Sequence, residues 1–263
     1  MGPSQAADLQ SRCDLLRSLH RPGDPLLLPN AWDVASARAV VAAGFPVVAT
    51  TSWAVAAMLG HEDHADAPGD EMLGAAARIA RDVDVPVTVD AEAGYDMEPA
   101  ELVAVLRSAG FAGCNLEDTD HATGRLRDPV EQAQWLAAVR EAAAKEGYGL
   151  VINARVDTFF EPWLAGAGDG AGSQQELVPD AVRRANAYLE VGVDCVYPIV
   201  LWETDALRSF MSDVRGAVNV VRLPRGPSLA ELAALGVARV SWGPMLFRET
   251  MAFFADRLVS LRE

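Results

Sequence analysis

Two apolar runs of the chain end in acidic residues that could hold a metal ion together. Pro86–Val89 is followed by Asp90 and Glu92, and Gly113–Leu116 is followed by Glu117. In an extended chain residues i and i+2 share a face, so Asp90 and Glu92 can converge, and a neighbouring parallel strand would bring Glu117 beside them. Adjacent carboxylates repel one another unless a cation joins them, and oxygen ligands suit Mg²⁺, with Mn²⁺ as the other candidate. Any one of these acids could instead cap a helix or lie in solvent, but the three together predict a metal site.

Such a site needs parallel strands whose carboxyl ends meet. Short β-branched runs alternate with longer stretches rich in alanine and leucine, which is the pattern of βα units. We expect strands at Leu26–Pro29, Val47–Thr50, Val87–Asp90, Gly113–Glu117, Leu150–Arg155, Asp194–Pro198, Val218–Val221 and Arg239–Trp242. We expect helices after them at Asp33–Ala43, Asp70–Asp82, Pro99–Ala109, Pro129–Glu146, Glu176–Glu190, Thr204–Val214, Leu229–Leu235 and Pro244–Leu261. An extra helix, Ala7–Leu19, is expected before the first strand.

Eight strands, each followed by a helix, predict an α/β fold of the (β/α)₈ TIM-barrel type that fills residues 1–263 as a single domain. A doubly wound open sheet is the alternative, because a sequence pattern does not reveal whether a sheet closes. Active sites of such barrels lie on the loops after the carboxyl ends of the strands, where Asp90, Glu92 and Glu117 fall. The low-complexity stretch 165–173 follows the fifth strand and is either a lid or an inert surface insertion.

The composition excludes several classes of function. The chain has 263 residues, 51% of them hydrophobic, and its net charge of −15 argues against binding to nucleic acid. No run reaches the roughly 18 apolar residues of a membrane span, and the first residues lack the apolar region of a signal peptide. The three cysteines, Cys13, Cys114 and Cys195, form no Cys-x-x-Cys pair. We therefore expect a reduced, cytoplasmic protein with neither a membrane nor a nucleic-acid partner.

A series of motifs runs along nearly the whole chain. These motifs are Leu28–Asp33, Ala43–Phe45, Asp90–Tyr95, Asn115–Asp118, Asn153–Asp157, Pro227–Leu232 and Arg239–Pro244. In order and spacing the series resembles the isocitrate lyase/phosphoenolpyruvate mutase superfamily. The resemblance implies a barrel enzyme that binds Mg²⁺ and a 2-oxo acid or its enolate, and that makes or breaks a C–C or P–C bond beside it. It also implies a homodimer or homotetramer in which neighbours exchange the last helix.

The resemblance assigns metal-binding roles to four acids. Asp90 corresponds to the direct metal ligand, and Glu92 and Glu117 correspond to residues that hold metal-bound water. Asp63 matches a further acid of the metal site.

The resemblance also indicates a substrate site. The residues expected to contact the substrate are Thr51, Ser52, Trp53, Asn153, Arg155 and Ser241. The segment 51–53 is expected to be a loop that receives the substrate carboxylate on backbone N–H groups and a hydroxyl. Arg155 matches the arginine that pairs with the substrate carboxylate or oxyanion, a role that suits its planar, permanently charged guanidinium.

The segment Thr119–Asp128, after the fourth strand, departs from the family. Isocitrate-type lyases carry a Lys-Cys-Gly-His type motif there, and the mutases carry a lysine and an asparagine in a longer gating loop. The segment is short and contains neither cysteine nor lysine, which argues against cleavage of isocitrate or methylisocitrate. His121 is the candidate acid or base in it, or else a solvated histidine. Arg125 and Arg127 could reach a distal carboxylate or form surface ion pairs.

Three weaker signals accompany these residues. Tyr95 is a catalytic candidate whose hydroxyl could lie near the metal-bound water, or whose ring could simply pack. His61 and His64 have a zinc-like spacing but no third ligand in register. The stretch Leu223–Pro227 follows the seventh strand, where barrels often bind phosphate.

We predict a Mg²⁺-dependent carbon–carbon lyase that acts through an enolate on a 2-oxo acid or a related 2-hydroxy di- or tricarboxylate. Decarboxylation of an oxaloacetate-like acid fits best, because departing CO₂ needs less acid–base assistance than an aldehyde. One alternative is P–C bond chemistry on phosphonopyruvate, as a hydrolase or a mutase. Another is a barrel that binds a 2-oxo acid without turning it over.

Overall fold

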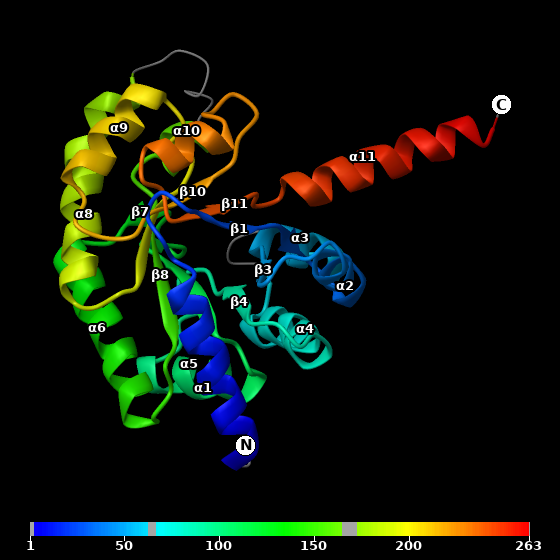
Figure 1. Cartoon of the computed structure of the whole chain (residues 1–263), viewed down its shortest axis with the longest axis horizontal. Coiled ribbons are helices and arrows are strands. Elements are labelled where there is room, and N and C mark those ends of the chain that lie inside the picture. Colours follow the sequence, from blue (N-terminus) through cyan, green and yellow to red (C-terminus); the bar gives the residue numbers. More distant parts are fainter. Residues whose placement is uncertain (1–2, 63–66, 165–172, 263) are drawn as a thin grey trace.

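The computed structural model describes residues 3–62, 67–164 and 173–262, and its strands lie in the middle of the molecule with helices around them (Figure 1). The strands are β1 Leu26–Leu28, β2 Asn30–Ala31, β3 Val48–Thr50, β4 Val87–Asp90, β5 Gly113–Glu117, β6 Thr119–Asp120, β7 Arg125–Leu126, β8 Val151–Val156, β9 Cys195–Pro198, β10 Asn219–Val221 and β11 Arg239–Ser241. The longer helices are α1 Pro3–Ser18, α2 Val34–Ala42, α4 Gly69–Asp82, α5 Pro99–Ala109, α6 Pro129–Lys145, α8 Val178–Glu190, α9 Thr204–Asp213 and α11 Met245–Ser260. The shorter ones are α3 Ser52–Leu59, α7 Phe160–Leu164, α10 Leu229–Ala234 and the 3₁₀ helix η2 Gln174–Leu177.

The parallel strands follow one another in chain order, as in a TIM barrel. Six of them form a sheet in the order β2-β3-β4-β5-β8-β9, and three form a sheet in the order β1-β11-β10. The strands β1 and β2 are separated only by Pro29, and a parallel bridge between Val196 and Val218 joins β9 to β10. In the described residues the ring is therefore TIM-barrel-like without being one continuous ladder. The order never reverses, which excludes the doubly wound alternative.

Two short helices and a short hairpin were not expected from the sequence. The segment 51–53 was expected to be a loop, but Ser52 begins helix α3 and Thr51 is its N-cap. This helix lacks an amphipathic pattern because Ala54, Val55 and Ala56 are all buried. The segment after β5 contains the antiparallel hairpin β6–β7, and α7 follows β8. Most of the low-complexity stretch, residues 165–172, lies outside the described residues.

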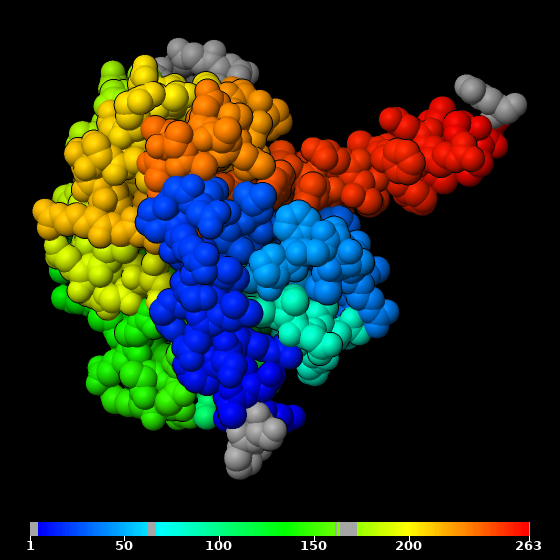
Figure 2. Space-filling view, in the orientation of Figure 1, coloured from blue at the N-terminus to red at the C-terminus, as the bar shows by residue number. Residues whose placement is uncertain are grey.

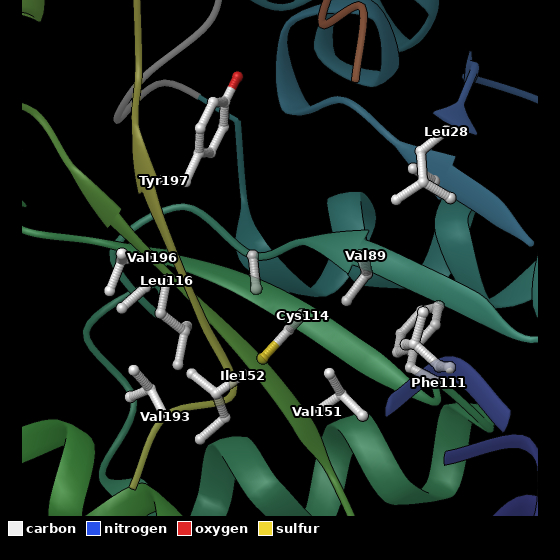
Figure 3. Close-up of a cluster of buried hydrophobic side chains, with 14 of the residues drawn as sticks. Leu28, Val89, Phe111, Cys114, Leu116, Val151, Ile152, Val193, Val196 and Tyr197 are labelled. Carbon is white, nitrogen blue, oxygen red and sulfur yellow. The ribbon is translucent and has the colours of Figure 1, made fainter. Parts of the chain in front are cut away.

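The core lies between the strands and the helices that surround them. Figure 3 shows part of it, where Val89, Cys114, Leu116 and Ile152 gather from neighbouring strands. All three cysteine thiols are free and buried. No helix in the described ranges is both long and apolar enough to cross a bilayer.

The last helix, α11, leaves the barrel and projects as an arm (Figures 1 and 2). None of its residues is buried, and Phe253 is 73% exposed. Its first turns stay on the barrel, since the Phe247 ring lies 5.1 Å from the ring of Trp32 and 5.8 Å from that of Trp53.

Candidate active site

A cavity of about 460 Å³ opens at the carboxyl ends of the strands. Its polar and charged lining residues are Asn30, Thr51, Ser52, His61, Glu62, Asp90, Asn115, Arg155, Tyr197, Ser241 and Arg248. Its apolar lining residues include Trp53, Phe160, Trp163, Ile199, Val200, Val221, Leu223 and Met245. In Figure 3 the Tyr197 hydroxyl points away from the apolar cluster. The cavity thus occupies the place where enzymes of this fold carry their active sites.

Asp90, the last residue of β4, is held in the cavity by neutral donors. One carboxylate oxygen accepts the backbone N–H of Ser52 at 3.0 Å, and the other accepts the Asn115 amide at 3.4 Å. Its own N–H donates to the Thr50 hydroxyl at 3.0 Å, which ties the ends of β3 and β4 together. Among the described residues Asp90 has no ion-pair partner, so its negative charge is available to a cation.

Glu92 and Glu117 meet at His121. The Nε2 atom of His121 lies 2.5 Å from Glu117, and its Nδ1 atom lies 3.5 Å from Glu92. Glu92 has a left-handed backbone with φ +48°, and its carbonyl accepts the N–H of Glu117 at 2.9 Å. The Tyr95 hydroxyl donates to Glu92 at 3.3 Å. A tight turn after β4 therefore places the second acid against the end of β5, and non-glycine residues in such conformations cluster at functional sites.

The acids and His121 shift each other's protonation. Burial raises the pKa of Glu117, while the charge of Arg155 opposes that rise. Burial lowers the pKa of His121, but the hydrogen bond and charge of Glu117, together with the charge of Glu92, raise it overall. Burial, helped by the charge of Glu92, raises the pKa of Tyr95 well above its usual value, so its hydroxyl stays protonated.

Arg155, at the end of β8, is clamped between two carboxylates. Its Nε and Nη2 atoms donate to the two oxygens of Asp157 at 2.6 and 2.9 Å, and its Nη1 atom pairs with Glu117. Both ends of the Arg155–Asp157 pair are almost fully buried. Burial lowers the pKa of Arg155, but Asp157 and Glu117 outweigh that effect and raise it. The guanidinium is thus charged and fixed in direction, with its centre 5.0 Å from the Phe160 ring.

Asp118 holds the Arg155–Asp157 pair in place and does not itself line the cavity. Its carboxylate accepts the N–H of Asp157 at 2.8 Å, the Tyr188 hydroxyl at 2.6 Å and an Arg184 N–H at 3.2 Å. Burial, followed by the charge of Asp157, raises the pKa of Asp118 to about 6. The site therefore depends on contacts that reach helix α8.

A polar network inside the barrel supports Asn115. The Asn115 side-chain oxygen accepts the Asn153 amide at 2.8 Å and Nη2 of Arg239 at 3.1 Å. With both donors on its oxygen, the Asn115 amide group is oriented toward Asp90. Arg239 is 1% exposed, so a buried cation lies two hydrogen bonds from the Asp90 carboxylate.

The structure brings most of the predicted site residues together. Thr51, Ser52, Trp53, Arg155, Ser241 and Asp90 line the cavity. Asn153 was expected to contact the substrate, but it is fully buried and donates to Asn115 instead. His121 and Tyr95 contact the acids Glu92 and Glu117 and are not among the lining residues. Asp63 and His64 lie outside the described residues.

The residues present are suited to a divalent cation in one respect. Asp90 offers a carboxylate whose described partners are neutral. Nearby, the three carboxylates Glu92, Glu117 and Asp157 outnumber the two basic side chains, Arg155 and His121. Within residues 3–62, 67–164 and 173–262 no three His, Cys, Asp or Glu side chains lie close enough to hold a metal ion by themselves. This donor set suits an ion with one direct carboxylate ligand and water in its remaining positions.

Some functional contacts were not anticipated. The Asn30 side-chain oxygen accepts the N–H groups of Trp242 and Gly243 at 2.8 and 2.9 Å, which joins β2 to the segment after β11 at the cavity. Asp157 is the buried partner of Arg155. The i, i+2 spacing of that pair on a strand was the signal that could have revealed it.

A family model described as phosphoenolpyruvate phosphomutase matches residues 16–262. The chain belongs to that family. This phosphoenolpyruvate phosphomutase family member is 40% identical to a solved structure from Burkholderia cenocepacia J2315 that is provisionally described as a phosphonomutase. The alignment covers 97% of this chain and 100% of the other, with a TM-score of 0.88.

Two other relatives support the assignment. An uncharacterized protein of Mycobacterium tuberculosis (strain ATCC 25618 / H37Rv) is 34% identical over 92% of this chain and 87% of its own length. A Corynebacterium glutamicum protein provisionally named 2-methylisocitrate lyase 2 is 32% identical over 80% of this chain and 62% of its own length. The predicted membership of the isocitrate lyase/phosphoenolpyruvate mutase superfamily is confirmed, and the family member is an enzyme of that superfamily's lyase or mutase type.

Proposed function

We propose that the protein is a Mg²⁺-dependent lyase that breaks a C–C bond of a 2-oxo acid, or of a related 2-hydroxy di- or tricarboxylate, through an enolate. The observation that carries the proposal is the arrangement of the cavity. Asp90, Arg155 and the beginning of helix α3 all line it. These groups provide an anchor for a cation, a fixed positive charge and a set of backbone donors.

The beginning of α3 provides the site for the substrate carboxylate. No side chain caps this helix, and the Ser52 N–H is used by Asp90. The N–H groups of Trp53 and Ala54 have no acceptor within the helix, because they belong to its first turn. A helix start of this kind favours an anion, and Thr51 and Ser52 line the cavity with their hydroxyls nearby.

Arg155 stabilises the charge that develops on the substrate oxygen. Its guanidinium is charged and is held in place by Asp157 and Glu117, so it needs no rearrangement as the enolate forms. Asp90 would hold Mg²⁺, with Glu92 and Glu117 binding its water, and the ion would supply Lewis-acid stabilisation of the enolate.

Decarboxylation of an oxaloacetate-like acid is the reaction that these residues suit best. The described lining contains neither lysine nor cysteine, the groups that many lyases use to protonate a leaving fragment. Departing CO₂ needs no proton donor. The remaining enolate can be protonated from water after the bond has broken.

The test is turnover of oxaloacetate with Mg²⁺, followed by the appearance of pyruvate. We expect turnover to stop in EDTA and kcat/KM to fall by at least ~100-fold in Arg155→Lys, because lysine cannot make the paired hydrogen bonds of the guanidinium. Arg38→Lys makes the same change in an exposed ion pair and should leave kcat/KM unaltered. Turnover that is independent of Mg²⁺, or unaffected in Arg155→Lys, would contradict the proposal.

P–C bond chemistry on phosphonopyruvate is the second candidate. The 40% identity to a structure described as a phosphonomutase favours it. Phosphorus NMR of phosphonopyruvate incubated with the enzyme would show phosphate or phosphoenolpyruvate if this reaction occurs. An unchanged spectrum alongside decarboxylation of oxaloacetate would exclude it.

A further inference from the structure

One wall of the cavity is apolar over several successive elements. Its residues come from α7, from the segment after β9, and from the end of β10 and the segment after it, and they are Phe160, Trp163, Ile199, Val200, Val221 and Leu223. The Phe160 and Trp163 rings stack with their centroids 5.9 Å apart. The polar groups of the proposed reaction, Asp90 and the start of α3, follow the earlier strands β3 and β4.

One lining cation, Arg155, borders this wall, with its centre 5.0 Å from the Phe160 ring, and it is already paired. Among the described lining residues the lysine and arginine cations are Arg155 and Arg248. Arg155 is paired with Asp157 and Glu117, and Arg248 lies 4.4 Å above the Trp53 ring at the start of α3. In the proposed reaction Arg155 serves the substrate oxygen, so a second carboxylate placed against the apolar wall would lose its hydration without gaining a further counter-ion.

Val200 is held in this wall by a strained backbone. Its φ is +55°, a left-handed conformation that is a genuine outlier for a β-branched residue, and it is 4% exposed. Its carbonyl accepts the Gln174 side-chain amide at 2.8 Å, and the Gln174 oxygen accepts the N–H groups of Trp202 and Glu203. Glycine would adopt this turn without steric strain. The chain instead carries a valine whose backbone is held by the hydrogen bonds of Gln174.

The cavity is larger than a three- or four-carbon acid requires. Its volume of about 460 Å³ lies in the range of roughly 300–1,000 Å³ that encloses drug-sized ligands. The part of the cavity beyond the carboxylate site is bounded by the apolar wall. Substrate atoms that reach this part would therefore strengthen binding if they are apolar.

We propose that this wall, with Val200 as a specificity-determining residue, selects 2-oxo or 2-hydroxy acids with an apolar, branched substituent on the carbon next to the oxygenated one. Oxaloacetate is then the unsubstituted member of the substrate class. The inference rests on the proposed function and adds the nature of the distal group to it.

The test is calorimetric binding with Mg²⁺ present. The probes are pyruvate, 2-oxobutanoate, 3-methyl-2-oxobutanoate and 2-oxoglutarate. Each added methylene group of the first three should tighten binding about fourfold, as expected for full burial. The second carboxylate of 2-oxoglutarate should bring no gain over pyruvate.

Val200→Gly should fold, because glycine suits the left-handed turn. In this variant the gain in binding affinity for each added methylene group should fall below about twofold. Val130→Gly removes the same side chain from the exposed start of α6 and should leave the series unchanged.

Equal affinities along the series, tighter binding of 2-oxoglutarate than of pyruvate, or an unchanged series in Val200→Gly would each overturn the inference while leaving the proposed function in place. Failure of every probe to bind, pyruvate included, would overturn both.

Discussion

The ion pair between Arg155 and Asp157 allows a quantitative test of how the site is built. Replacing Asp157 with asparagine removes the charge and leaves one acceptor oxygen, so either Nε or Nη2 of Arg155 loses its partner. Breaking a buried pair by removing one partner costs ~3–5 kcal/mol. Since Arg155 remains paired with Glu117, we expect the lower end, about 3 kcal/mol, in the free energy of unfolding measured by urea denaturation.

The matched control is Asp82→Asn. Asp82 also holds an arginine by two hydrogen bonds, to Arg38 at 2.7 and 2.6 Å, but the Arg38 side chain is 68% exposed. The control should barely change the denaturation midpoint, since water replaces a lost surface pair. Equal losses of unfolding free energy in Asp157→Asn and Asp82→Asn would refute the reasoning. Burial would then make no difference to how much the ion pair stabilises the fold.

Two further predictions concern pH and assembly. Burial, together with the charge of Arg239, lowers the pKa of His20 to about 4. The unfolded chain therefore binds a proton at His20 at higher pH than the folded protein does. The free energy of unfolding should fall as pH drops from about 6.5 to 4, by up to roughly 3 kcal/mol more than in His20→Gln, measured by urea denaturation of both proteins. The same pH dependence of the free energy of unfolding in both proteins would contradict this prediction. We also propose that a second copy of the chain covers the exposed apolar residues of α11. Light scattering should then give a mass that is a multiple of 28.0 kDa, and the double change Phe253→Ser and Phe254→Ser should lower that mass. A monomeric mass for the unmodified protein would refute this proposal.

Most of the barrel was predictable from the sequence because its elements have clear periods and boundaries. The strands Val87–Asp90 and Gly113–Glu117 and the helix Pro99–Ala109 were predicted with the observed bounds. Helix α3 was not, since the residues after its polar start are apolar on every face and show no amphipathic period. The hairpin β6–β7 has strands of two residues, which leave no pattern to detect.

The site was predictable in its residue types but not in its contacts. Asp90 and Arg155 could be placed in the cavity because both lie at the carboxyl end of a strand, and that position shows in the sequence. Asn153 also lies on a strand, but whether an interior side chain reaches the cavity or stops below it depends on the stagger between strands. Contacts such as that from Asn30 to Trp242 join residues far apart in the chain, so only the folded structure reveals them.

The most direct test of the central claim is calorimetric titration of Mg²⁺ into the protein and into Asp90→Asn. The account predicts that the unmodified protein binds the ion, that Asp90→Asn loses this binding, and that pyruvate tightens the ion's affinity in the first protein only. Asp24→Asn, which neutralises an acid whose side chain is 83% exposed, should bind Mg²⁺ as the unmodified protein does. Equal Mg²⁺ affinity in Asp90→Asn and the unmodified protein would contradict the claim.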